Sequence, residues 1–241
     1  MDALYIGASG MLAQNQSLAL IADNLANSQS PGYLATVGTF VAFPSGTVLR
    51  TGPLPGVIGQ SSAGVALTSE INTRASDIEP TANPLDFAIN GPGFFVVNTP
   101  KGLAYTRDGQ FSLDANGRLV TSRGDYVLDQ AGKPIALNPA LPVSVNSAGV
   151  ITQGGKVVAT LALTNLSPVN LKAIGNNLYQ GGARLPFTGQ VEQSALNTSN
   201  VNLSEAMVQL IDAESRYQSL TDVVNEESKR LSTAATLGML T

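Results

Sequence analysis

The sequence contains no cysteine and no histidine. Their absence excludes disulfide bonds, thiolate nucleophiles, serine–histidine relays and nearly every kind of zinc site. The acidic residues are scattered along the chain, and no pair of them can be argued from spacing to flank a glycosidic bond. We therefore predict that the protein is not an enzyme and has no catalytic residues, no bound metal, no cofactor and no small-molecule substrate.

Charge is also scarce, since charged residues make up 12% of the chain, compared with about 25% in an average soluble protein. The net charge is −4 and no basic stripe is visible, so no nucleic-acid partner is expected. The 24 glycines and 13 prolines predict β structure rich in turns. So few charges also indicate a surface that is partly covered by neighbouring molecules.

Residues 3–22 carry no charge, but the polar residues from Gln14 to Ser17 interrupt this run too heavily for a membrane span. We expect a soluble amphipathic helix there and no integral membrane protein. The start Met1-Asp2 lacks a positively charged region, so no cleaved secretory signal peptide is expected.

The N-terminal segment carries an apolar heptad repeat, which predicts a helix with one apolar seam that packs against another helix. Its small companion residues would let another helix approach closely. An ordinary amphipathic helix packed on its own domain remains an alternative for this segment. The repeat consists of Leu4, Met11, Leu18 and Leu25, with Ala8, Asn15 and Ala22 at the companion position.

The C-terminal segment carries a second and longer repeat of the same kind. Asn202 and Glu205 have the spacing of a capping box, so we expect the helix to start there and to run to about Leu237. The repeat consists of Leu203, Leu210, Tyr217, Val224 and Leu231, with Ala206, Ala213, Leu220 and Ala234 as companions and Glu227 as the charged exception.

Between the two repeats the pattern changes to short strand-like segments and turn dipeptides such as Asn90-Gly91 and Asn116-Gly117. The expected fold class is therefore α+β, with a central, mostly antiparallel β domain. We assign three regions: the terminal helices pair into one helical assembly domain, an extended connector follows the first helix, and the β domain follows the connector. Their boundaries are 1–30 with 200–241, 31–80, and 81–199.

Neither terminal helix is expected to be stable alone, because most helical stability in proteins comes from packing. Even when the two helices pair, apolar stripes stay uncovered, and each fully buried Leu or Val is worth about 1.5–3 kcal/mol. The natural partner for these stripes is another copy of the chain. We therefore predict that the nine apolar residues of the two repeats form an assembly interface.

Four segments carry a resemblance to a known family. The stretch ADNLANSQSPGY (22–33) resembles the N-terminal signature of the flagellar rod and hook axial proteins. The stretches 83–97 and 104–128 resemble the central β-domain signature of the hook, proximal-rod and distal-rod branch, and residues 199–218 resemble the C-terminal signature.

The first of these segments ends in a turn whose residues are Asn24, Asn27, Pro31, Gly32 and Tyr33. Pro31 disfavours helical geometry at the residue before it, and Gly32 can take the positive φ that a sharp turn needs. The two asparagines could hydrogen-bond to backbone or to neighbouring subunits, or merely cap the helix.

The resemblance implies a structural subunit of the bacterial flagellar basal-body rod, with both terminal helices lining the inner layer of a tubular polymer and the β domain outside. It implies copies of the chain, other rod proteins above and below, and the flagellar export apparatus as partners, and a place in the periplasmic part of the cell envelope. Residues 1–5 and 40–44 favour a proximal-rod protein, whereas residues 174–179 are closer to a distal-rod one.

Several tempting sites are better explained as structure. Residues 91–93 lack the third glycine of a dinucleotide-binding loop, and residues 114–117 lack the closing glutamate of a calcium loop, so both are expected to be turns. Tyr105, Arg107 and Asp108 are expected at a strand end or a subunit contact. An alternative function, a secreted carbohydrate-binding or carbohydrate-acting β protein with helical oligomerisation arms, stays open at this point.

Overall fold

The computed structural model describes residues 2–44, 46–50, 56–61 and 63–238. The chain forms two compact units, which we call the terminal unit and the β unit. The terminal unit comprises residues 1–25, 36–69 and 203–241, and the β unit comprises residues 26–35 and 70–202.

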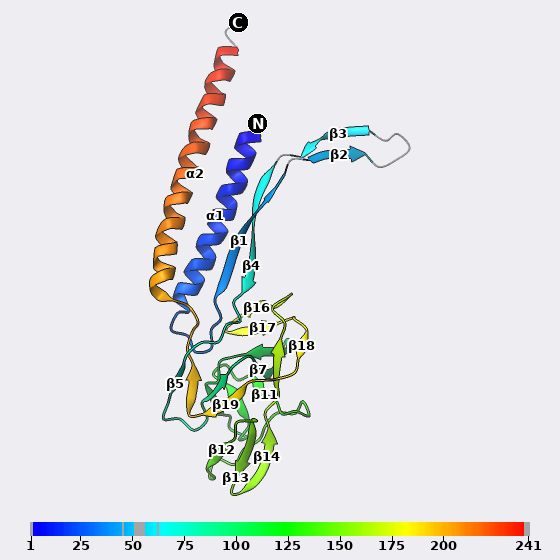
Figure 1. Ribbon diagram of the computed structural model, residues 1–241, viewed down its shortest axis with the longest axis vertical. Helices are drawn as coiled ribbons and strands as arrows, with labels where there is room; N and C mark the ends of the chain where they lie inside the picture. The colour runs from blue at the N-terminus through cyan, green and yellow to red at the C-terminus, as the bar shows by residue number, and fades with distance from the viewer. Residues whose placement is uncertain (1, 45, 51–55, 62, 239–241) are drawn as a thin grey trace. The chain divides into compact units, whose positions relative to one another are not determined.

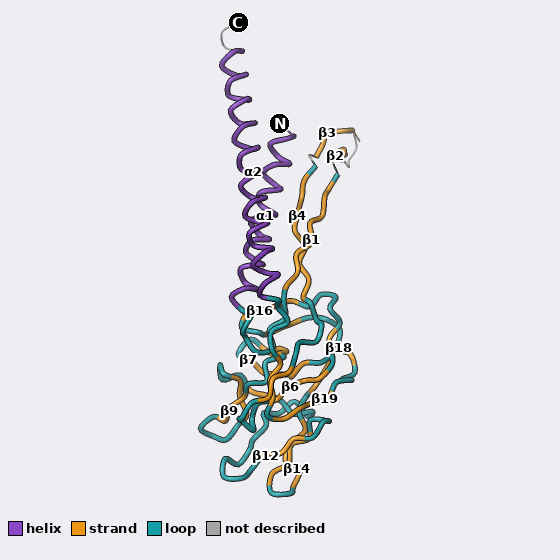
Figure 2. Tube along the Cα trace, turned by 60° about the vertical axis from the view of Figure 1, so that its left-hand side comes forward, coloured by secondary structure: helices purple, strands orange, loops and turns teal. Residues whose placement is uncertain are grey.

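Two helices and two strand pairs form the terminal unit. Strand β1 pairs with β4, and β2 pairs antiparallel with β3. In Figures 1 and 2 the helices lie side by side, with β1 and β4 next to each other. The elements are α1 (Asp2–Ala26), β1 (Thr36–Phe43), β2 (Gly46–Arg50), β3 (Gly56–Ser61), β4 (Gly64–Ile71) and α2 (Leu203–Gly238).

Helix α2 begins one residue after Asn202 and has Glu205 in its first turn, as the capping-box spacing predicts. It continues for 36 residues, because no glycine or proline interrupts the segment before Gly238. The predicted extent of the C-terminal helix is therefore confirmed.

Residues 31–80, which we expected to form an extended connector, contain the strand pairs of the terminal unit. Three of the glycines that suggested irregular structure begin strands: Gly46 pairs with Ser61, Gly56 pairs with Arg50, and Gly64 begins β4. Between β1 and β4, Thr68 Oγ1 donates a hydrogen bond to the carbonyl of Thr39. Composition alone did not reveal these strands because glycine and threonine are compatible with both loops and edge strands.

The β unit consists of short strands, which form one nine-stranded sheet and several smaller sheets. The strand pairs within it are antiparallel, so the predicted mostly antiparallel β region is confirmed. The strands are β5 (Ile78–Pro80), β6 (Phe87–Asn90), β7 (Phe94–Thr99), β8 (Gly102–Thr106), β9 (Phe111–Leu113), β10 (Leu119–Thr121), β11 (Tyr126–Val127), β12 (Val143–Val145), β13 (Val150–Gln153), β14 (Lys156–Thr160), β15 (Leu163–Leu166), β16 (Lys172–Gly175), β17 (Leu178–Gln180), β18 (Arg184–Leu185), β19 (Gln190–Gln193) and β20 (Ala195–Asn197).

The largest sheet runs in the order β16-β17-β8-β7-β11-β10-β9, with β15 pairing to both β7 and β18. Strand β7 separates two apolar cores, because successive side chains of a strand point to opposite faces. Phe95 and Val97 belong to one core, whereas Phe94 and Val96 belong to the other. In the first core, the rings of Phe95 and Phe111 meet edge to face with their centroids 5.1 Å apart.

The dipeptide Asn116-Gly117 forms the turn between β9 and β10. Gly117 has a φ of +73°, and its N–H donates to the carbonyl of Asp114 over 2.9 Å. The carboxylate of Asp114 accepts the backbone N–H groups of Asn116 and Arg118, each over 2.8 Å. The segment is thus the predicted hairpin turn and not a calcium loop.

Candidate assembly interface

The two helices of the terminal unit contact each other closely. Gln14 lies buried in α1 and donates a hydrogen bond from Nε2 to the carbonyl of Ala213 in α2 over 3.1 Å. Toward the N-terminus of α1, a methyl group added to Gly7 would lie only 2.7 Å from Cγ2 of Val224. Glycine at this position therefore lets the helices approach more closely than alanine would.

The heptad repeat of α2 coincides with its covered face. Leu210, Tyr217 and Val224 are half-buried, and the companion residues Ala206 and Ala213 are buried. Residues three and four positions apart lie on one side of a helix, so these five side chains form a continuous stripe. This stripe includes the point where Val224 meets α1.

The heptad repeat of α1 coincides with its covered face only in part. Met11, Leu18 and Leu25 are half-buried, but among the side chains of this helix that the structure describes, the buried ones are Ala13 and Gln14, which lie outside the repeat. The expected companion residues are exposed in the chain, and they are Ala8, Asn15 and Ala22.

The covered face of α1 is shifted because this helix has a second neighbour in the same unit. Ser9 Oγ accepts the backbone N–H of Val65 in β4 over 3.1 Å. A methyl group added to Gly38 in β1 would lie 3.3 Å from Cδ1 of Leu20. A helix that is covered by a helix and a strand pair needs a wider buried face than a heptad seam provides.

The other three residues of the predicted interface are Leu203, Leu4 and Leu231. Leu203, the first residue of α2, is 45% exposed. Leu4 and Leu231 lie within the helices, but their side chains fall outside the described part of the structure.

The family-signature turn begins with asparagines that bind backbone. Asn24 Nδ2 donates to the carbonyl of Thr36 over 2.8 Å, and Asn24 Oδ1 accepts the N–H of the same residue over 2.9 Å. This two-way pair fixes the start of β1 against the last turns of α1. Asn27 shapes the turn that follows, since its carbonyl accepts the N–H of Ser30 over 3.1 Å.

The next residues of the turn are held inside the β unit. The carbonyl of Pro31 accepts a hydrogen bond from Asn177 Nδ2 over 3.0 Å, and the N–H of Gly32 donates to the carbonyl of Asn197 over 2.8 Å. Gly32 has a φ of +66°, as expected for a sharp turn. A Cβ atom at this position would collide with the backbone of Arg107.

The segment after Gly32 is also held in place by hydrogen bonds and by burial. The backbone of Tyr33 accepts the N–H of Asn200, and the N–H of Ala35 donates to Oδ1 of Asn200 over 2.7 Å. Leu34 is buried, and its N–H donates to the hydroxyl of Tyr179 over 2.9 Å. Burial raises the pKa of Tyr179 above its ordinary value, so this hydroxyl stays protonated at neutral pH.

Arg107 and Asp108 follow the end of β8 and have structural surroundings. Arg107 is buried, and its Nη2 donates to the carbonyls of Ile89 and Gly91 over 3.2 and 2.9 Å. Burial lowers the pKa of Arg107 and raises the pKa of the Asp108 carboxyl. The arginine braces the turn before β7, which agrees with the expected role at a strand end.

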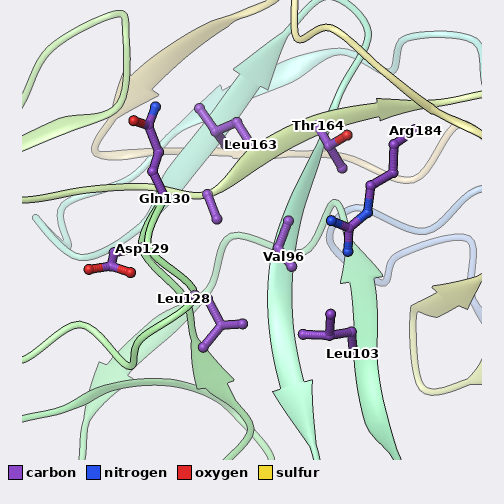
Figure 3. Close-up of a pocket in the computed structure, with 10 residues that line it drawn as sticks. Val96, Leu103, Leu128, Asp129, Gln130, Leu163, Thr164 and Arg184 are labelled. Carbon is purple, nitrogen blue, oxygen red and sulfur yellow. The ribbon is translucent and has the colours of Figure 1, made fainter.

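A cavity of about 350 Å³ lies on the sheet of the β unit (Figure 3). Three of its four polar side chains have partners within the chain. Arg184 Nε donates to the hydroxyl of Tyr105 over 2.6 Å, Thr164 Oγ1 donates to backbone carbonyls, and Asp129 Oδ1 accepts the N–H of Lys133 over 2.7 Å. With most of its polar groups engaged elsewhere, the cavity is not arranged as a small-molecule site. Its lining residues include Val96, Leu103, Leu128, Ala162 and Leu163.

Among the described residues, no group of three or more acidic side chains could hold a metal ion. No helix within the same residues is long and apolar enough to span a bilayer.

A second set of apolar side chains in the terminal unit points to solvent, and all of them except Leu203 lie outside the predicted heptad repeats. In α2, Met207, Val208 and Ile211 lie close together off the repeat, where three neighbouring apolar residues were the available signal, and Val223 lies further along the helix. In β1 they lie in the region expected to be a connector. The exposed residues of this unit are Ile6, Leu12, Val37, Phe40, Phe43, Leu203, Met207, Val208, Ile211 and Val223.

Three family models match the chain in order along the sequence. Residues 4–33 match a model for flagella basal body rod proteins. Residues 88–153 match the D1 domain of the flagellar hook protein FlgE/F/G. Residues 192–237 match the C-terminal region of the flagellar basal body rod FlgEFG proteins.

Relatives are similar over nearly their whole length. The chain is 31% identical to the flagellar basal-body rod protein FlgF of Mesorhizobium japonicum, over 93% of this chain and 92% of the relative. It is 33% identical to FlgF of Rhizobium meliloti, over 98% and 97% of the two chains. It is 30% identical to the flagellar basal-body rod protein FlgG of Bacillus subtilis, over 96% and 97%.

These matches cover the helical ends and the β unit alike, and they decide between the two functions that the sequence left open. The chain therefore belongs to the flagellar basal-body rod protein family and is a structural subunit of the rod, not an enzyme.

Proposed function

We propose that this rod subunit polymerises through its terminal unit, with α1 and α2 pairing in the manner of a coiled coil and lining the inner layer of a tubular rod. The main support for this proposal is that exposed apolar side chains gather in the terminal unit. Ten of the seventeen exposed large hydrophobic residues in the described chain belong to the terminal unit, although this unit supplies the smaller share of the described side chains. Contiguous exposed apolar surface marks sites of protein association, and such side chains gather in the terminal unit.

The seam residues have a double role in this proposal. Leu210, Tyr217 and Val224 are half-buried, so each packs within the chain and keeps surface for a neighbouring subunit. Met11 and Leu18 are in the same situation on α1. The partners are copies of the chain and other rod proteins above and below it.

Substitution of Leu210 tests the proposal. Leu210→Asp would place an unpaired carboxylate on the half-buried stripe, which costs several kcal/mol, enough to abolish polymerisation at about 1.4 kcal/mol per tenfold in affinity. The variant should keep the β-rich circular dichroism of the β unit but fail to enter rods and leave cells non-motile. Ser215→Asp, at an exposed polar position of the same helix, is the matched control and should assemble normally. Normal motility of the Leu210 variant would mean that the seam is not an assembly surface.

The proximal part of the rod is the place we propose for the subunit. Residues 1–5 and 40–44 support this, because they resemble proximal-rod proteins, whereas residues 174–179 resemble distal-rod ones. Relatives named FlgF and FlgG are similar at comparable identities, 31–33% and 28–32%. Tomography of basal bodies carrying a tagged subunit tests the position: tag density at the membrane-distal end of the rod would contradict it.

Export through the flagellum's own secretion apparatus, and a position in the periplasmic part of the envelope, complete the proposal. Both are supported by membership of the rod protein family. In cells that lack the export gate, the subunit should stay in the cytoplasmic fraction. Its appearance in the periplasmic fraction of such cells would point to another export route.

A further inference from the structure

The first turns of α2 carry a compact apolar patch that faces solvent. Its side chains are 52%, 67% and 68% exposed, and they lie away from the covered stripe marked by Ala206 and Ala213. Beyond this point the same side of the helix becomes polar, with Glu214, Ser215 and Gln218. The patch, which we call the α2 patch, consists of Met207, Val208 and Ile211.

The outer face of α1 is complementary to this patch in size. Its residues follow each other at alternating spacings of four and three, so they form one stripe along the helix. The stripe is exposed, carries no charge and contains a single large side chain. We call it the α1 stripe, and it consists of Ala8, Leu12, Asn15, Ala19 and Ala22.

The contact between the two helices within the chain shows how such surfaces fit together. There, large side chains of α2 lie over the smallest residues of α1. Cγ2 of Val224 would be 2.7 Å from a methyl group on Gly7, and both Cδ atoms of Leu220 would be within 4 Å of one on Gly10. Large residues on α2 and small residues on α1 are therefore the pattern by which these helices pack.

We infer that the α2 patch of one copy packs against the α1 stripe of a second copy. This inference rests on the proposed assembly through the terminal unit and names the two surfaces that meet. A patch that bound its own equivalent would form a closed two-fold dimer, whereas a contact between two different surfaces can repeat and build a filament. A rod needs the second kind of contact.

The exposed side chains of β1 are a less suitable counterpart for the α2 patch. Val37, Phe40 and Phe43 are themselves large and exposed. They leave no room for the large side chains of a helix to pack between them. Small residues on a helix allow the close approach that interdigitation requires.

Cysteine cross-linking tests the contact without background, because the chain has no cysteine. Ala19→Cys is mixed with Met207→Cys, Val208→Cys or Ile211→Cys in turn, so that at least one pair matches the register, and the assembled protein is oxidised. A disulfide between two copies is expected for at least one pair, with none for Ala19→Cys mixed with Ser215→Cys. Dimers formed by the Val208 variant alone would overturn the inference, since they indicate a patch that binds itself.

The results distinguish a failure of this contact from a failure of assembly through the terminal unit. If the protein sediments as polymer but no pair cross-links, the inference fails and assembly through the terminal unit stands. If Leu210→Asp assembles normally, the proposed function fails instead.

A size exchange provides a second test that needs no cysteine. Ala19→Leu puts a large side chain on the α1 stripe, and Ile211→Ala removes a large side chain from the α2 patch. Each change alone should therefore lower incorporation into rods about tenfold or more. Because both positions are exposed, circular dichroism of the monomer should not change. The double variant should recover part of the loss if the two residues meet, and a simple product of the two losses would contradict the contact.

Discussion

At the residue scale, Gly32 shows why the chain turns where it does. Its φ of +66° is one that side-chain-bearing residues rarely adopt, and the backbone of Arg107 and Asp108 fills the space that a Cβ atom would need. The turn is therefore specified twice, by conformation and by packing. Pro31 keeps Ser30 out of helical geometry, and Gly32 takes the positive φ that the turn needs.

Gly32→Ala is expected to destabilise the β unit by about 3 kcal/mol or more, because strain at positive φ adds to a backbone collision. Gly124 is the matched control, since its φ is +89° and nothing lies within 4 Å of a Cβ there. Gly124→Ala should cost only about 1 kcal/mol. Urea unfolding measures both, and equal losses would show that packing around Gly32 contributes nothing.

Asp114 is expected to give the β9–β10 turn a dependence on pH. Backbone and side-chain hydrogen bonds, first of all from the N–H of Arg118, hold the pKa of Asp114 below its ordinary value. Such a group stabilises the fold above its unfolded pKa of about 3.9, and this contribution is lost as the pH falls through the lowered folded value.

Asp114→Asn should therefore unfold at lower urea concentration than the parent protein near neutral pH. The gap should close as the solution is acidified well below about pH 3.9, where the parent carboxylate is protonated too. A gap of the same size at every pH would show that the charge of Asp114 has no role in the turn.

At the element scale, the pairing of α1 and α2 depends on the glycines of α1. Gly10 has room for a methyl group, whose nearest neighbour would be Leu220 at 3.8 Å, whereas Gly7 has Val224 at 2.7 Å. Glycine within a helix is less stable than alanine by about 0.5–1 kcal/mol. Replacement of glycine by alanine should therefore affect the stability of the helix pair differently at these two positions.

Gly10→Ala should raise the thermal midpoint of the terminal unit by an amount that corresponds to about 0.5–1 kcal/mol. Gly7→Ala should give no gain or a loss, because the stiff side chain of Val224 must move aside. Helicity followed by circular dichroism during heating compares the two variants. An equal gain in both would mean that the helices are not packed closely at Gly7.

The elements also show how far sequence reasoning reaches. The heptad of α2 and its capping residue predict both the helix and its covered face, because Ala206, Leu210 and Ala213 repeat without interruption. The covered face of α1 could not be predicted in the same way, since β1 and β4 also pack on it. Their pairing connects residues far apart in sequence, for which a local pattern gives no signal. The contacts that hold the signature turn, such as Asn177 to Pro31, are equally long-range.

At the scale of the whole molecule, exposed apolar surface is unevenly divided. The β unit has two apolar cores and a network of antiparallel strands. The terminal unit leaves many large side chains in solvent. Elements with few buried contacts open at low free energy, whereas those in a packed core open only with the whole domain.

Hydrogen exchange should follow this division. In dilute protein, the amides of α1 and α2 are expected to exchange much faster than those of β7 and β8. In the assembled rod, the two helices should become as protected as the strands, because neighbouring copies cover them. Strong protection of both helices at nanomolar concentration would show that the terminal unit needs no partner.

A density map of the isolated basal body, at a resolution that shows side chains, would reveal which part of the subunit lines the rod. We predict that α1 and α2 of this subunit line the inner layer. We also predict that Met207, Val208 and Ile211 lie within about 4.5 Å of a neighbouring subunit, the distance of apolar contact. A map in which these side chains remain in solvent, or in which the β unit forms the inner layer, would contradict assembly through the terminal unit.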